Sequence, residues 1–146
     1  MEPKEEVTDS PTGWVAKHVR AYVETDGTKG GRKWGMDMLL LTTRGRKSGQ
    51  LRRTALIYGR DGDRYLVVPS NGGAAKHPAW YLNLRADPNV WVQVVADKFA
   101  AVARTATAEE KPALWKLMAK IFPTYDRYQA GTRREIPVVI IERLPD

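Results

Sequence analysis

The turn sequence Asp-Gly-Asp at residues 61–63, between two extended-type segments, constrains the fold more than any other feature. An Asp-Gly pair between segments of high strand propensity is a strong hairpin signal, so residues 51–59 and 64–70 are predicted to pair as antiparallel strands. A third extended segment, residues 36–43, lies just upstream. Strands this closely spaced favour a small closed or split β-barrel, because a parallel sheet would need a helical crossover between strands. The sequence therefore predicts a mainly β protein with flanking helices.

Three more strands and two or three helices complete the predicted domain. The strands are expected at residues 90–95, 99–105 and 136–144, and the helices at 12–25, from His77-Pro78 onward and from Thr107 onward. Thr107 and Glu110 form a capping box, but Pro112 conflicts with a helix that begins at Thr107, so the helix either begins later or has a distorted first turn. The polar residues 1–11 are expected to be a disordered tail, and residues 12–146 a single domain.

The composition favours an anionic partner and excludes several chemistries. The chain of 146 residues has 24 Lys or Arg against 17 Asp or Glu, a net charge of +7, which suits a phosphate, a polycarboxylate, a nucleic acid or a membrane surface. It has no cysteine, which excludes disulfides and a thiol nucleophile, and its two histidines, His18 and His77, lack the spacing of a metal site. No apolar run approaches the roughly 20 residues of a membrane span, and no signal peptide is recognised, so a cytoplasmic protein is expected.

A block of positive charge follows the apolar run at residues 38–41. Five cations lie within ten residues without an acid among them, at Arg44, Arg46, Lys47, Arg52 and Arg53. Such a block repels itself unless an anion neutralises it. The Gly45–Gly49 segment lacks the spacer of a nucleotide-binding P-loop, so triphosphate binding is rejected. The alternative is a solvated basic turn; five charges in so short a stretch favour an anionic ligand instead.

Two further connections favour a ligand that is elongated and flat as well as anionic. Ser70 to Gly73 is a loop that exposes its backbone, and His77-Pro78 opens a helix whose positive end would face what that loop holds. Trp80 and Tyr81 follow on this helix, where such rings are more often part of the core than ligand contacts.

The predicted helix at residues 12–25 allows two interpretations. Trp14, Val15, His18, Val19 and Tyr22 share one face at helical spacing, which favours a helix packed on the core. A membrane-surface or lid helix stays open, because aromatic residues with flanking cations suit an interface.

Taken together, these segments resemble the deazaflavin-dependent nitroreductases, small actinobacterial proteins that use coenzyme F420. The resemblance is carried by LLLTTRGRKSGQLRRTALIY (39–58), VVPSNGG (67–73) and KHPAWYLN (76–83), and it resumes at FPTYDRYQ (122–129) and IPVVII (136–141). It implies a split β-barrel related to flavin reductases. It also implies a site for F420, whose tail carries a phosphodiester and several glutamate carboxylates.

The resemblance assigns binding residues by their position in these motifs. Those expected to hold the tail are Arg46, Lys47, Ser48, Arg52 and Arg53. Those expected to surround the deazaflavin ring are Thr54, Ala55, Leu56, Ile57, Val68, Pro69, Ser70, Asn71, Ala79, Trp80, Tyr81, Leu82 and Asn83. Ala55 departs from the family pattern, which often has Pro at that position.

The reaction that the resemblance implies is hydride transfer from reduced deazaflavin to a small-molecule acceptor: a quinone, a nitroaromatic or an activated enone. The cofactor performs the difficult step, so no protein nucleophile is needed. Ser70, Tyr125 and Tyr128 are the candidate catalytic residues, each able to donate a hydrogen bond to the acceptor oxygen as negative charge develops. Quinone reduction by family members at the membrane implies a peripheral membrane contact through residues 12–25.

Two other classes of protein stay open. A nucleic-acid module would suit the basic composition, but the charge concentrates in one loop instead of spreading over a strand face with stacking aromatics. A non-catalytic F420 carrier would use the same binding residues, and Tyr125 with Tyr128 favours an enzyme over it.

Overall fold

The computed structural model describes residues 3–9 and 13–145 of this chain. These residues form a mainly β fold with nine strands, four α-helices and one 3-10 turn. The strands are β1 (Val7–Asp9), β2 (Arg32–Lys33), β3 (Met36–Arg44), β4 (Leu51–Ile57), β5 (Gly59–Asp61), β6 (Arg64–Val67), β7 (Asn89–Val94), β8 (Asp97–Thr105) and β9 (Val139–Arg143). The helices are α1 (Gly13–Thr25), α2 (Ala79–Ala86), α3 (Lys111–Ile121) and α4 (Thr124–Ala130), and the 3-10 turn is η1 (Asn71–Gly73).

The sheet is curled, because two strands that follow each other directly in the chain lie near its opposite ends. The strand order is β1-β4-β3-β7-β8-β9-β6-β5, with β2 paired to β3 at the side. Only β1 and β4 run parallel; the other pairs are antiparallel. β4 and β5 lie far apart in this order, yet Tyr58 alone separates them along the chain. The β5 edge must therefore return to β4, although the pairing among the described residues does not close into a ring.

Strand β3 is buried on both of its faces. Leu39 and Leu41 point into the main core cluster, whereas Met38 and Leu40 pack against α1, as the alternation of side chains along a strand requires. None of these four is more than 4% exposed. The apolar run that reads as a strand in the sequence is thus the strand around which the layers assemble.

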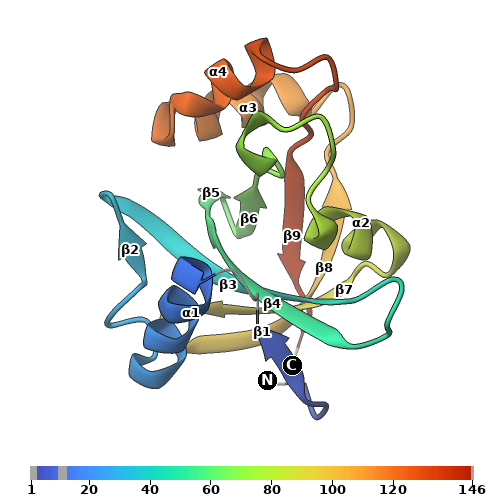
Figure 1. The fold of residues 1–146 in the computed structure, drawn as a ribbon. Coiled ribbons are helices and arrows are strands. Elements are labelled where there is room, and N and C mark those ends of the chain that lie inside the picture. Colours follow the sequence, from blue (N-terminus) through green and yellow to red (C-terminus); the bar gives the residue numbers. More distant parts are fainter. Residues whose placement is uncertain (1–2, 10–12, 146) are drawn as a thin grey trace.

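The helices cover different parts of the curled sheet. Figure 1 shows α3 and α4 together at one end of the molecule and α1 at the other. α1 packs on β4, α2 lies against β3 and β8, and α3 lies over β5 and β6. A Cβ at Gly59 would lie 2.6 Å from the Sδ of Met118, so the glycine permits α3 to approach the sheet this closely.

Helix α1 is a core helix, as its apolar pattern predicts. Val19 and Tyr22 are fully buried, and the Tyr22 hydroxyl lies 3.1 Å from the carbonyl oxygen of Met38 and 3.2 Å from that of Gln93. The same hydroxyl accepts a hydrogen bond from the Val95 amide at 2.6 Å. Burial raises the pKa of Tyr22 to about 12, so the phenol keeps its proton. The side chain of Trp14, predicted on this face, lies outside the described residues.

In the described part of the chain, no helix combines the length and the apolar character that crossing a membrane requires.

Several sequence predictions need correction. The disordered tail was expected to include residues 7–9, but these form β1, whose backbone pairs with the edge of β4 and whose Asp9 bonds Arg53. The expected strand 51–59 is divided at Tyr58, and the hairpin β2 was not predicted, so nine strands replace six. The capping box at Thr107, by contrast, is present with hydrogen bonds of 2.9 and 3.2 Å, and α3 begins at Lys111, which is the later start that Pro112 left open.

A second correction concerns the segment after Pro123. No helix was predicted in this short polar and aromatic segment, but Thr124–Ala130 forms α4. The reason is tertiary: Tyr125, 4% exposed, packs its ring between Trp115 and Phe122. Pro123 is compatible with this helix because it precedes the first turn.

Replacement of Tyr22 by Phe should lower the free energy of unfolding by about 1–3 kcal/mol, because polar groups of β3 and β7 lose their partner. Tyr58→Phe is the matched control: its ring packs on the core, but its hydroxyl has no hydrogen-bond partner in the described part of the chain. Urea unfolding of both variants measures the difference. Equal losses in the two variants would contradict the role given to the Tyr22 hydroxyl.

Candidate functional site

A pocket of about 700 Å³ opens where three connections of the sheet meet. Its walls are the β3–β4 loop with the start of β4, the η1 turn, and the segment that leads into α2. These are the basic loop, the glycine loop and the start of the aromatic helix that the sequence singles out. The structure therefore brings together segments that are up to about forty residues apart.

The β3–β4 loop holds its shape through its own backbone. The Gly45 amide donates to the Gln50 carbonyl at 2.7 Å, and the Gly49 amide donates to the Gly45 carbonyl at 2.8 Å. Gly49 has a φ of +72°, a conformation that favours glycine. The Ser48 hydroxyl accepts from the Gln50 amide at 3.1 Å. The side chains of Arg46 and Lys47 thus project from a loop whose backbone is fixed.

Asn83 of α2 fastens this loop from the opposite side. It is 5% exposed, its Oδ1 accepts from the Arg46 amide at 3.1 Å, and its Nδ2 donates to the Thr43 hydroxyl at 3.2 Å. One buried amide side chain therefore sets the spacing between the basic loop and α2.

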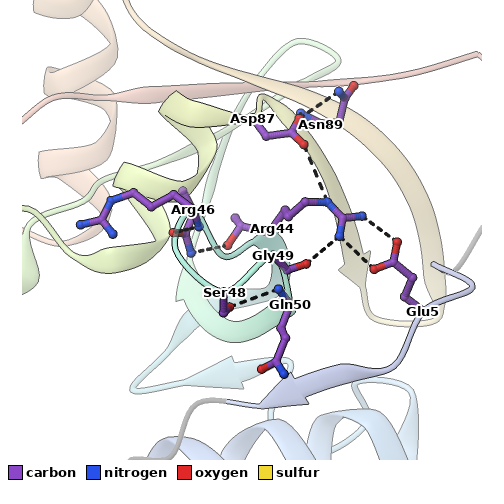
Figure 2. A network of polar contacts seen from close by, with 10 residues as sticks. Glu5, Arg44, Arg46, Ser48, Gly49, Gln50, Asp87 and Asn89 are labelled. Atoms are coloured by element: carbon purple, nitrogen blue, oxygen red, sulfur yellow. Dashed lines mark hydrogen bonds and ion pairs between the residues drawn. The ribbon is translucent and has the colours of Figure 1, made fainter.

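The guanidinium of Arg44 is bound by other groups of the same chain, as Figure 2 shows. Its guanidinium donates to both carboxylate oxygens of Glu5 at 2.9 Å and to the Gly49 carbonyl at 2.8 Å, and it lies 3.9 Å from Asp87. The hydrogen bond from Arg44 holds the pKa of the Glu5 carboxyl below its ordinary value. The Arg46 side chain runs away from this network. Arg44 thus braces the loop, and the pocket does not include it.

A second ion pair removes Arg53 from the set of unpaired cations. Its Nε donates to Asp9 of β1 at 2.6 Å. Arg46, Lys47 and Arg52, by contrast, are exposed, line the pocket and form no ion pair within the described residues. Lys76 adds a fourth such cation from the η1–α2 connection. The pocket therefore has strong positive charge that no carboxylate of the described chain offsets.

The wall formed by η1 is held by Arg134, which lies in the segment between α4 and β9. Its Nη2 donates to the carbonyl oxygens of Ser70 and Pro69 at 2.6 and 3.2 Å, and its Nε donates to that of Ala74 at 2.8 Å. Its Nη1 lies 3.0 Å from Nδ1 of His77. Burial, followed by the charges of Arg134 and Arg85, lowers the pKa of His77, so the ring is neutral at pH 7.

The structure gathers ten of the eighteen expected binding residues around the pocket. These are Arg46, Lys47, Ser48, Arg52, Arg53, Thr54, Asn71, Ala79, Trp80 and Asn83. Eight others do not line it: Ala55, Leu56, Ile57, Val68, Pro69, Ser70, Tyr81 and Leu82. On β4, Ala55 and Ile57 face the α1 cluster because they alternate with Thr54 along the strand. Leu56 and Tyr81 pack in the main core instead.

Sequence reasoning missed six residues at this site. Five line the pocket, namely Thr43, Gly45, Lys76, His77 and Pro78, and the sixth is Arg134. The motif at residues 76–78 was interpreted as the start of a helix, and its cation and imidazole were left out. Arg134 carries no local signal, because its partners lie 57 to 65 residues away in the sequence.

The three candidate catalytic residues lie near the η1 side and do not line the pocket. Ser70 is half-buried, and its carbonyl accepts from Arg134. Tyr128 is half-buried on α4, and a Cβ at Gly73 would lie 3.3 Å from its Cβ. Tyr125 is buried, and burial raises its pKa well above the ordinary value for a phenol. Tyr128 is thus the tyrosine next to the glycine loop.

The described residues contain no cluster of three or more His, Cys, Asp or Glu side chains that could hold a metal ion.

Comparisons with known proteins agree on the class of protein. Residues 14–143 match the family model described as F420H(2)-dependent quinone reductase. The chain is 37% identical over 143 residues to an F420H(2)-dependent quinone reductase of Mycobacterium tuberculosis, which covers 89% of this chain and 96% of that protein. Among solved structures, an F420-H2 dependent reductase is 40% identical with a TM-score of 0.67, and covers 72% of this chain and 93% of its own. A structure described as a domain-swapped dimer is 38% identical with a TM-score of 0.70, and covers 91% of this chain and 100% of its own.

Proposed function

Because the chain belongs to the F420H(2)-dependent quinone reductase family, we propose that the pocket beside the β3–β4 loop binds coenzyme F420 and presents it to a quinone. Membership of this family makes the protein an oxidoreductase with F420 as its cofactor and quinone reduction as its activity. One observation carries the placement: Arg46, Lys47 and Arg52 line a single pocket and have no carboxylate partner in the described part of the chain.

The residues of the pocket fit this cofactor. Its tail has several negative charges in a row. Besides Arg53, which is paired with Asp9, the pocket offers three cations without an ion pair among the described residues from one loop and strand, and a fourth, Lys76, from the facing segment. The volume of about 700 Å³ lies in the usual range of ligand-binding pockets. Ala79 and Trp80 supply apolar surface next to these cations, which suits a flat ring joined to a charged tail.

Reduced F420, when bound, supplies the hydride. The role of the protein is to bind the cofactor and to orient it. Arg46, Lys47 and Arg52 would hold the phosphodiester and carboxylates, and Asn83 keeps their loop at a fixed distance from α2. Because the backbone of the loop is fixed before ligand arrives, less conformational freedom is lost on binding. No nucleophilic side chain is required, in keeping with the absence of cysteine.

The quinone acceptor is proposed to lie on the η1 and α4 side, where Ser70 and Tyr128 are half-buried. A hydroxyl there can donate a hydrogen bond to the acceptor oxygen as negative charge develops. Tyr125 is proposed to act by supporting Tyr128, since its own ring is buried between Trp115 and Phe122.

Two finer features also belong to the proposal. The curled sheet is inferred to be a split β-barrel, because Tyr58 alone joins β4, next to one end of the strand order, to β5 at the other end. A peripheral membrane contact through α1 would use Lys17 and Arg20, which are exposed, since Val19 and Tyr22 are turned inward. Sedimentation with vesicles of anionic and of neutral lipid tests this contact: equal binding to both would oppose it.

The decisive experiment is an absorbance titration with oxidised F420 beside one with FMN, followed by oxidation of reduced F420 with menadione. F420 should bind in clear preference, because the unpaired cations match a tail with several carboxylates and FMN has a single phosphate. Equal or tighter binding of FMN would overturn the cofactor assignment. Binding of F420 without turnover of menadione or a nitroaromatic would indicate a carrier protein instead.

Arg52→Ala should weaken binding of F420 by about 1–3 kcal/mol, the scale of a lost charge-assisted hydrogen bond. Lys47→Ala should do the same, and wild-type affinity should fall as salt rises to roughly 0.5 M, because exposed charges are screened. Arg20→Ala is the matched control, because it removes the same charge from an exposed site on α1. A loss in the control as large as that in Arg52→Ala would show a general effect of net charge.

Tyr128→Phe should lower kcat with menadione by roughly ten- to a thousandfold, the range for loss of one polar donor to developing charge. The Kd of F420 should change by less than about threefold, because the contacts to the tail remain. Tyr125→Phe is the comparison on the same helix and should have the smaller effect on kcat. Wild-type turnover of both variants with menadione and with a nitroaromatic would remove the tyrosines from the mechanism and leave Ser70 as the candidate.

A further inference from the structure

Arg134 contacts both the η1 wall of the pocket and the imidazole of His77, and the second contact specifies which nitrogen of that ring is protonated. The guanidinium reaches the carbonyl oxygens of Pro69, Ser70 and Ala74, and with its remaining nitrogen it contacts Nδ1 of His77 at 3.0 Å. Every one of these contacts uses an N–H of the arginine. The side chain thus acts as a clamp across the glycine loop.

The contact with His77 settles the tautomer. A guanidinium has five N–H donors and no acceptor, so the partner nitrogen must offer a lone pair. Nδ1 of His77 is therefore unprotonated, and the single proton of the neutral ring is on Nε2. A charged imidazolium would lose this hydrogen bond and face Arg134 directly.

The surroundings of His77 oppose its protonation from each side. Arg134 approaches from the α4–β9 segment, Arg85 from α2, and Lys76 precedes it in the chain. The ring of Tyr81 lies 4.8 Å from the imidazole, centroid to centroid. No carboxylate among the described residues bonds His77, so nothing there favours the charged form.

No described residue forms a hydrogen bond with Nε2 of His77. His77 lines the pocket, and within the described residues its only hydrogen-bonding contact is the one from Nδ1 to Arg134. The pocket thus contains a neutral donor beside four cations that form no ion pair among the described residues. A cation suits the tail carboxylates, whereas a neutral donor suits an uncharged carbonyl oxygen and adds no further charge to the site.

We propose that Arg134 is a positioning residue that clamps the Pro69–Ala74 loop and sets His77 as a neutral Nε2–H donor to a carbonyl oxygen of the bound deazaflavin ring. This inference rests on the proposed function, in which the pocket holds F420. In the proposed site, the cations bind the tail of the cofactor, and the pair of Arg134 and His77 recognises its ring.

The tautomer is tested without cofactor. The chain has two histidines, His18 and His77, so long-range ¹H–¹⁵N spectra resolve both rings, and His77→Gln assigns the signals. The His77 ring should show the Nε2–H tautomer at pH 7. In Arg134→Met its pKa should rise toward the ordinary value of 6.5. An Nδ1–H tautomer, or a charged His77 ring in the wild type at pH 7, would overturn the proposal whatever the cofactor proves to be.

Two substitutions of His77 separate its two nitrogens. The amide of Gln reaches the position of Nε2, so His77→Gln keeps a donor in the pocket, whereas the amide of Asn reaches only the position of Nδ1. Absorbance titration should give a Kd of F420 about three- to tenfold weaker for His77→Asn, the scale of one neutral hydrogen bond. For His77→Gln the Kd should stay within about threefold of wild type. Urea unfolding checks that both variants are folded.

Three other results of these titrations would contradict the role given to His77 or the proposed function. Equal Kd values for the two variants, whether weakened or not, would show that His77 only packs on Tyr81. Repeating the titration with the deazaflavin riboside, which lacks the phosphodiester and glutamates, locates the contact: if the difference between the variants vanishes, His77 binds the tail and the assignment to the ring falls. Failure of the wild type to bind F420 would instead remove the proposed function and leave the tautomer result standing.

Discussion

The burial of β3 on both faces is the constraint on which the rest of the structure depends. Met38 and Leu40 need α1 as a cover, while Leu39 and Leu41 need the curled sheet, so the two layers are defined by four successive residues. Where the strand leaves the core, its sequence changes to Thr42, Thr43 and Arg44. The pocket begins at this change, because the same strand that organises the core presents the basic loop at its end.

The cations of the basic loop and the start of β4 fall into two groups, according to whether they form an ion pair with a described residue. Arg44 and Arg53 are paired with Glu5 and Asp9 of the N-terminal segment and hold the framework in place. The other cations of the block point toward the pocket and keep their charge unpaired within the described residues. Exposed ion pairs contribute little to stability on their own, so the importance of these two pairs lies in the direction that each guanidinium takes.

The parts of the fold that the sequence predicts are those governed by local chemistry. The hairpin turn at Gly62, the apolar run of β3, the amphipathic pattern of α1 and the capping box at Thr107 each depend on residues a few positions apart, and all are present. β1 and α4 escaped prediction, because distant partners stabilise them: the edge of β4 for the former, Trp115 and Phe122 for the latter. The site followed the same division. The basic block was evident from the local sequence alone, whereas Arg134 depends on contacts with residues about sixty positions away.

The central place of β9 has a consequence for how the chain reaches its native state. Val139, Ile140 and Ile141 are fully buried, and their strand pairs with both β6 and β8. Until this strand is available, β6 and β8 lack the neighbour that joins them, and the sheet cannot curl. During synthesis from the N-terminus, the earlier strands are therefore complete before their partner β9 is made, and this non-local pairing favours slow folding with apolar surface transiently exposed.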